Sequence, residues 1–153
     1  MYRRLVVLAL VLAVAAPAAA ATAAVTQGTP RADNLVGTAG ADRLNGRGGD
    51  DRIRGRAGDD RLNGGRGSDD VFGDAGHDII TGGPGNDTLL GGAGPDRITG
   101  GPGVDLIVAG VGNDVIRARD GEVDQITCGP GRDRVLADAG DHAARDCEVV
   151  RRG

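Results

Sequence analysis

Aspartates recur at one fixed interval through the middle of this 153-residue chain. A carboxylate at one phase of a repeating fold would form a column of oxygen atoms, and oxygen is the ligand atom that hard divalent cations prefer. Ca²⁺ accepts roughly six to eight oxygens in a loose arrangement, whereas Mg²⁺ demands a tight octahedron and retains its waters. The spacing therefore indicates several calcium ions held by carboxylates and backbone carbonyls. The aspartates stand nine residues apart, at Asp33, Asp42, Asp51, Asp60, Asp69, Asp78, Asp87, Asp96, Asp105 and Asp114.

Each aspartate belongs to a nine-residue repeat that predicts a turn followed by a short strand. From Asp42 onward a glycine stands two positions before each aspartate, and glycine supplies the crowded or left-handed backbone positions that tight turns need. Triplets such as Arg52-Ile53-Arg54 place one apolar residue between two polar ones, and a strand points alternate side chains to opposite faces. The expected inward residues are Leu35, Leu44, Ile53, Leu62, Val71, Ile80, Leu89, Ile98, Ile107 and Ile116.

A period this short predicts a solenoid in which two repeats make one coil. Three-residue strands cannot stand alone and must stack on the next coil, so residues eighteen apart lie on the same side. The aspartates then form two columns, with Asp69 and Asp87 as neighbours in one of them. Adjacent coils lie roughly 4.8 Å apart, and two carboxylates at that distance repel by several kcal/mol at an effective dielectric of about 20. A divalent cation between them would turn this repulsion into attraction.

The repeat resembles a known family. Residues 82–90, Gly-Gly-Pro-Gly-Asn-Asp-Thr-Leu-Leu, fit the RTX (haemolysin-type) pattern G-G-x-G-x-D-x-U-x at every specified position. The family repeat is a calcium-binding β-helix motif. The resemblance covers about residues 28–117 and extends weakly to about 140. It implies an all-β fold, a parallel β-roll in which six residues of each repeat form a turn and three form a strand.

The repeats differ in how closely they follow the glycine pattern. In the first repeat Thr29 and Arg31 replace two glycines, so we expect it to be an N-terminal cap around Asp33. Thr38 and Arg47 take the second position of the next two repeats. Four later repeats keep all three glycines, and we expect the best-formed calcium sites there. Their first residues, expected to belong to the metal sites, are Gly64, Gly82, Gly91 and Gly100.

The apolar content is too small to hold such a roll together without metal. The inward positions provide one aliphatic residue per repeat, the chain has a single Phe, and its 29 glycines lose the most backbone entropy on ordering. We therefore predict that the repeat region is disordered without calcium and folds when calcium binds, so that binding energy becomes folding energy.

The start of the chain is typical of a secretory signal peptide. Arg3 and Arg4 precede an apolar stretch at 5–16, and residues 18–24 offer several A-x-A cleavage points. The apolar stretch is shorter than the roughly 20 residues that span a bilayer, so no membrane span is expected after cleavage. The expected organisation is a signal peptide at 1–24, a lead-in at 25–32, the β-roll at 33–117, and degenerate repeats with a C-terminal cap at 118–153.

The C-terminal part departs from the nine-residue step. Asp124 lies ten residues beyond Asp114, and His142 is expected to take the aspartate position of the last repeat. Cys128 and Cys147 are the only cysteines, and in a secreted chain they are expected to form a disulfide that holds the cap.

Composition narrows the function further. Two His and two Cys give little support for a zinc or copper site. The sequence offers no combination of nucleophile, base and orienting group that would suggest an enzyme. A net charge of −4 with almost no aromatic residues argues against nucleic acid. The sequence therefore predicts a secreted calcium-binding module that serves as an extracellular scaffold. The alternative is adhesion, in which outward arginines dock a cell-wall or other polyanionic partner; charge balance is the simpler role for Arg43, Arg52, Arg61 and Arg97.

Overall fold

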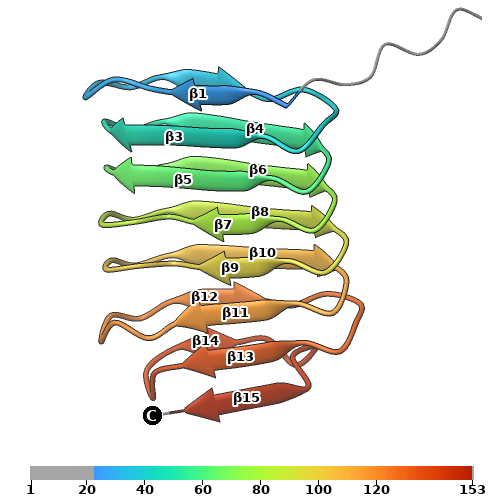
Figure 1. Ribbon diagram of the computed structural model, residues 1–153. Helices are drawn as coiled ribbons and strands as arrows, with labels where there is room; N and C mark the ends of the chain where they lie inside the picture. Colours follow the sequence, from blue (N-terminus) through green and yellow to red (C-terminus); the bar gives the residue numbers. More distant parts are fainter. Residues whose placement is uncertain (1–22, 153) are drawn as a thin grey trace, which may run out of the picture.

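The computed structural model describes residues 23–152, and all regular structure in that range is β-strand. Two parallel sheets lie back to back, and the chain alternates between them so that each coil adds one strand to each sheet (Figure 1). The odd sheet contains β1 (Val25–Gln27), β3 (Arg43–Gly48), β5 (Arg61–Arg66), β7 (Ile79–Thr81), β9 (Arg97–Thr99), β11 (Val115–Ala118), β13 (Arg134–Ala137) and β15 (Val149–Arg152). The even sheet contains β2 (Asn34–Val36), β4 (Arg52–Ala57), β6 (Asp70–Ala75), β8 (Thr88–Ala93), β10 (Leu106–Val111), β12 (Gln125–Thr127) and β14 (His142–Ala143).

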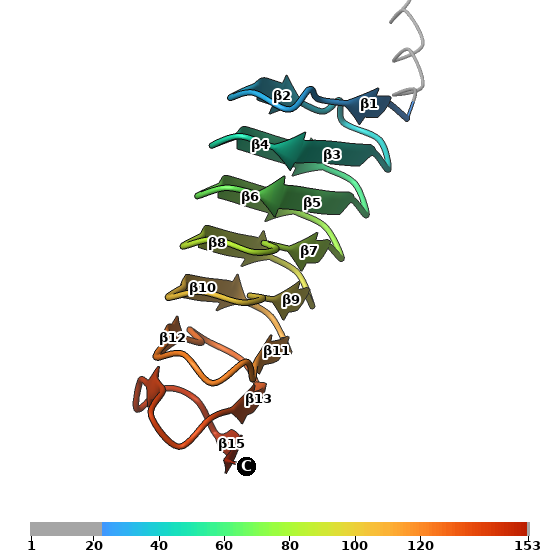
Figure 2. The same ribbon diagram turned by 90° about the vertical axis from the view of Figure 1, so that its left-hand side faces the viewer.

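Neighbouring strands in each sheet are parallel, and through the middle of the roll they are offset by eighteen residues. Leu44 faces Leu62 in the odd sheet and Ile53 faces Val71 in the even sheet. The predicted parallel β-roll with two repeats per coil is confirmed. Figure 2 shows the coils stacked in one column from the N-terminal to the C-terminal end.

A single row of aliphatic side chains per sheet fills the space between the sheets. All ten predicted inward residues are buried, from 8 % exposed for Leu35 to 0 % for Ile53, and Ile126 and Val135 extend the rows. The core is therefore narrow, one large side chain deep for each strand, as the sequence predicts.

Several strands are longer than expected. The prediction of three-residue strands holds for β7 and β9, but it is wrong for β3, β4, β5, β6, β8 and β10, which each have six residues. The reason is that the backbone continues extended through a second inward position. In β3, Leu44 and Gly46 are both buried, and the pairing with β5 continues to Arg47 opposite Gly65.

The two ends of the roll differ. The stretch expected as a lead-in contributes β1, which pairs with β3. At the other end β15 closes the odd sheet against β13. The expected signal peptide falls almost entirely outside the described residues. Within 23–152 the chain has no helix with the length and apolar character needed to cross a bilayer.

The predicted disulfide is present between Cys128 and Cys147, whose Cα atoms are 5.2 Å apart. It ties the end of β12 to the segment before β15. We expect the double change C128A/C147A to lower the free energy of unfolding by about 3 kcal/mol, because the crosslink closes a loop of nineteen residues in the unfolded chain. Alanine suits the buried position, since Ala109 and Ala118 occupy the equivalent one.

Urea unfolding at saturating Ca²⁺, followed by circular dichroism, measures this change. Unchanged midpoints for the oxidised wild type and the variant would show that the disulfide does not support the cap.

Candidate metal centre

The aspartates of the repeats lie at the turn before each strand, and they are buried. From Asp42 to Asp133 each is at most 2 % exposed. One carboxylate oxygen, Oδ1, accepts a hydrogen bond from the backbone N–H of the aspartate one coil earlier. Asp69 Oδ1 accepts from the Asp51 N–H at 2.7 Å, and Asp87 Oδ1 accepts from the Asp69 N–H at 2.8 Å. These bonds link the aspartates into the two columns that the sequence predicts.

The second oxygen, Oδ2, has no hydrogen-bond partner in most of these residues. Buried polar atoms without a partner are rare, because desolvation is not repaid. A whole row of acceptors left open at the same position indicates a site for a positively charged group. The open Oδ2 atoms belong to Asp51, Asp60, Asp69, Asp78, Asp87, Asp96, Asp105, Asp114, Asp124 and Asp133.

The first glycine of each repeat leaves room beside this oxygen. A methyl group on Gly82 would collide with Asp87 Oδ2 and with the carbonyl oxygen of Gly100. Gly82 does not have a positive φ, so close approach rather than backbone handedness requires glycine here. A carboxylate oxygen and a carbonyl oxygen thus converge on one point. We call this arrangement a two-oxygen cradle, and it recurs with open Oδ2 atoms at Asp51, Asp60, Asp69, Asp78, Asp87 and Asp96.

The carbonyls at the cradles include those singled out in the sequence. The oxygens of Gly64, Gly82, Gly91 and Gly100 lie beside the glycines one coil earlier, at 46, 64, 73 and 82. No three or more His, Cys, Asp or Glu side chains within 23–152 gather into a group that could hold a metal ion by themselves. A cation here would therefore need backbone carbonyls in its shell. Oxygen donors of mixed carboxylate and carbonyl type fit Ca²⁺.

The first two aspartates are different because threonines satisfy them. Thr29 donates to Asp33 Oδ2 from its N–H at 2.5 Å and from its hydroxyl at 2.9 Å. The Thr38 N–H donates to Asp42 Oδ2 at 2.5 Å, and the Thr38 hydroxyl lies 3.0 Å from Asp42 Oδ1. Asp33 and Asp42 were both expected among the metal ligands, yet the oxygen that is open elsewhere is already bonded in both.

Two residues that the sequence did not single out as ligands continue the columns. Asp124 Oδ1 accepts from the Asp105 N–H and Asp133 Oδ1 accepts from the Asp114 N–H, each at 2.8 Å. The signal was available, because each is followed two positions later by a buried aliphatic residue. Beyond Gly100, however, the first glycine of the repeat is replaced, and the buried side chains Ala109, Ala118 and Cys128 occupy the equivalent positions.

The expectation for the last repeat needs a correction. Asp141, and not His142, takes the aspartate position, because the Asp124 N–H donates to Asp141 Oδ1 at 3.0 Å. His142 instead lies one position later, opposite Gln125 in β14. The coil is one residue shorter here than in the middle of the roll.

Burial disfavours the ionised form of these carboxyls and so raises their pKa. Desolvation raises the pKa of Asp96 to about 7, and it raises those of Asp60, Asp87 and Asp105 to about 6. In each case a backbone N–H from the previous coil lowers the pKa in part, and the charge of a neighbouring aspartate raises it further. Desolvation also raises the pKa of Asp42, but bonds from Ala24 and Thr38 outweigh it, and the net pKa is lowered. The Asp42 carboxylate is thus stabilised by neutral hydrogen-bond donors, which the open Oδ2 atoms of the later aspartates lack.

Comparison with known proteins agrees with this geometry. A family model made of four copies of the RTX calcium-binding nonapeptide repeat matches residues 27–62, 47–80 and 81–116. These segments together cover 27–116, more than half of the chain. A search of the curated proteins found no match. The chain therefore belongs to the RTX calcium-binding nonapeptide-repeat family.

Proposed function

We propose that this chain is a secreted calcium-binding module that folds when Ca²⁺ binds and serves as an extracellular scaffold without catalytic activity. The observation that carries the proposal is the row of buried Oδ2 atoms without partners, six of which face a carbonyl oxygen in a cradle. When bound, Ca²⁺ supplies the positive charge that the buried carboxylates lack.

We infer six calcium ions, one for each two-oxygen cradle from Asp51 to Asp96. Asp33 and Asp42 are excluded from this count because threonines already satisfy them. Asp105 is also left out, since a methyl group on Gly100 would meet the Asp105 carboxylate but no carbonyl oxygen. At Asp114 a methyl group stands where the earlier repeats have a glycine. The sites beyond Asp96 are therefore poorer in converging oxygens.

Coupling between metal and fold follows from the same features. The core is one aliphatic residue deep, and the buried carboxylates at the turns repel one another along each column. A ligand that binds the folded chain but not the unfolded chain stabilises the folded chain by mass action, and here the site exists only when two coils are stacked. Each cradle takes its carboxylate from one coil and its carbonyl from the next, for example Asp87 and Gly100.

An extracellular location is supported by the disulfide and by the expected leader. Disulfides persist in oxidising compartments, and calcium sites in extracellular modules work at roughly millimolar ion concentrations. We infer that the chain stays unfolded where calcium is scarce and acquires its roll outside the cell.

The test is a titration of the purified, oxidised protein with Ca²⁺ and, separately, with Mg²⁺, followed by far-ultraviolet circular dichroism. At pH 8, where the buried carboxyls are ionised, we expect a coil-like spectrum in chelator, a β-rich spectrum with Ca²⁺, and no such change with Mg²⁺. Isothermal titration calorimetry should give about six ions per chain, one for each two-oxygen cradle. A β-rich spectrum that persists in chelator would show that the roll stands on its own packing and would refute calcium-coupled folding.

A further inference from the structure

The outer face of the odd sheet carries positive charge without any acidic partner. Outward positions alternate with buried ones along each strand, and on this sheet no strand places Asp or Glu at an outward position within the described range. The chain as a whole has a net charge of −4, so the sign of the charge on this face is opposite to that of the whole chain. The outward arginines at the first or third position of these strands are Arg43, Arg61, Arg97, Arg117, Arg134 and Arg151.

On the even sheet, by contrast, arginines lie beside acidic residues. There Arg52 lies opposite Asp70, and Arg54 forms an ion pair with Asp74 at 2.5 Å. Across residues 23–152 none of the six odd-sheet arginines makes an ion pair. Arg43 and Arg61 even lie directly opposite each other on adjacent strands, an arrangement of like charges that destabilises a sheet. Charge balance, the simpler expectation from the sequence, therefore accounts for Arg52 but not for this face.

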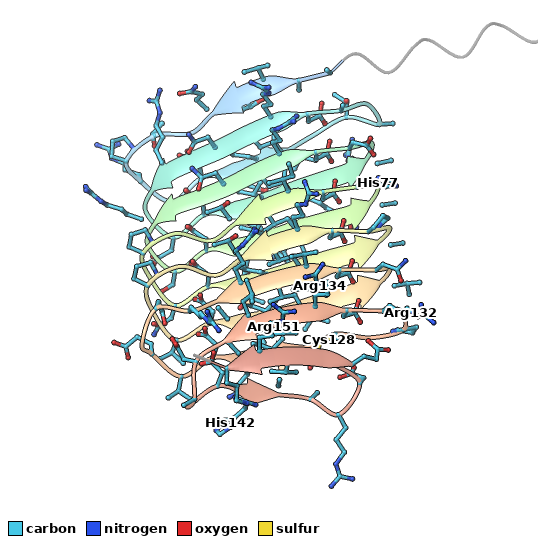
Figure 3. The ribbon with its side chains drawn as sticks, turned by 60° about the horizontal axis from the view of Figure 1, so that its bottom comes forward. His77, Cys128, Arg132, Arg134, His142 and Arg151 are labelled. Atoms are coloured by element: carbon cyan, nitrogen blue, oxygen red, sulfur yellow. A yellow bond between two sulfur atoms is a disulfide. The ribbon has the colours of Figure 1, made fainter. Side chains whose placement is uncertain are left out.

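Toward the C-terminal end the arginines surround a hollow of about 370 Å³ over β9, β11, β13 and β15. Figure 3 labels Arg134 and Arg151, which project from this part of the roll. Register places Val115 opposite Arg134 and Leu136 opposite Arg151, so that arginines and half-buried aliphatic residues alternate between strands. The hollow thus has guanidinium groups around an apolar floor.

The row of arginines is long. It runs from β3 to β15 with one gap at β7, which carries no arginine, and it spans roughly 30 Å at about 4.8 Å per strand. A small anion would meet only part of it, whereas an extended polyanion lying across the strands would meet all of it. Guanidinium groups bind sulfate and carboxylate through paired, directional hydrogen bonds. A surface of one sign also steers an oppositely charged partner toward it.

We propose that the outer face of the odd sheet binds a linear acidic polysaccharide along the roll axis. The proposal rests on the proposed function, because the face exists only in the folded roll. No aromatic side chain projects from this face, and single-stranded nucleic acid binding relies on stacking upon such rings. Val115 and Leu136 are half-buried between arginines. Val25 and Ile79 are exposed on this face, but Arg43 and Arg61 lie between them, so the face has no continuous apolar stripe to insert into a membrane.

The experiment measures binding of the full chain to immobilised dextran sulfate, with neutral dextran as reference, at saturating Ca²⁺. The test variant R97Q/R134Q removes two charges from the odd sheet. The control R52Q/R54Q removes two charges from the even sheet. Circular dichroism with Ca²⁺ establishes that each variant folds. We expect dextran sulfate binding to weaken about tenfold or more in the test variant and to stay within about twofold of wild type in the control.

Several outcomes would overturn the proposal: equal losses in both variants, equal binding to neutral dextran, or no binding of the folded wild type. Tighter binding to phosphatidylglycerol vesicles or to single-stranded DNA would assign the face to those partners instead. If the protein folds on Ca²⁺ but both variants bind dextran sulfate equally well, polysaccharide binding by the odd sheet is refuted and the proposed function is not. If only the test variant loses dextran sulfate binding but the protein is already folded in chelator, calcium-coupled folding is refuted and polysaccharide binding is not.

Discussion

Replacing Asp87 with asparagine is expected to remove one calcium ion from the middle of the roll and to lower the free energy of unfolding in Ca²⁺ by about 3 kcal/mol. The estimate is the stabilisation that one ion gives at about a hundred times its dissociation constant. Asparagine keeps an oxygen to accept the Asp69 N–H, so the column bond can persist. Its amide group, however, places N–H donors where Asp87 Oδ2 faces the Gly100 carbonyl, and these donors would repel a cation.

Asp42→Asn is the matched control for this change. Asp42 is as buried as Asp87 and also accepts a backbone N–H from the preceding coil, but its Oδ2 is bonded to Thr38. We expect calorimetry to give one ion fewer for D87N and an unchanged number for D42N. Asp33→Ala at the first repeat should also leave the number unchanged. Loss of an ion in D42N, or an unchanged number in D87N, would show that the threonine bonds do not decide which aspartates bind metal.

Ca²⁺ is expected to bind the folded roll at least about tenfold more weakly at pH 5 than at pH 7.5, as measured by competition with a chelator of known affinity at each pH. Burial raises the pKa of Asp96 to about 7 and that of Asp87 to about 6. A proton must therefore leave before the carboxylate can bind the cation. One pH unit below the pKa, a single competing proton weakens binding about tenfold.

Without metal, the same carboxyls should act in the opposite direction. A carboxyl with a raised pKa in the roll holds its proton more tightly than it does in the unfolded chain. The metal-free roll is therefore favoured as the pH falls from about 7 toward 4, and this stability is lost as the pH rises through the folded-state pKa values. Circular dichroism in chelator should show more β-structure at pH 5 than at pH 8. Equal amounts of β-structure in chelator at the two pH values would contradict this account.

The sequence predicted the register of the roll because repeat length alone decides which residues stack in a solenoid. The row from Leu44 to Ile116 followed directly from the nine-residue spacing. The six-residue strands could not be predicted in the same way, since pairing beyond each triplet depends on the neighbouring coil. Asp124 stays in its column despite the ten-residue step because the extra residue lies in an exposed turn at 119–123, where Gly121 has open space around it.

The site was predictable as a column but not atom by atom. Thr38 and Arg47 both replace the second glycine, yet only Arg47 adopts the left-handed backbone of a glycine, with a φ of 80°. At Thr38 the N–H and hydroxyl turn toward the carboxylate of Asp42 instead. A hydroxyl at the second position therefore distinguishes the repeats whose aspartate is already hydrogen-bonded. Whether that hydroxyl reaches the carboxylate depends on the backbone conformation of the turn.

Alternation between two sheets makes the coil, and not the repeat, the unit by which this protein can change its length. Removing the eighteen residues 82–99 would take one strand from each sheet and leave every later residue on its original side. Removing nine residues would transfer everything downstream to the other side. Arg117, Arg134 and Arg151 would then lie across the molecule from Arg43 and Arg61. Related rolls that keep a working face are therefore expected to gain or lose repeats in pairs.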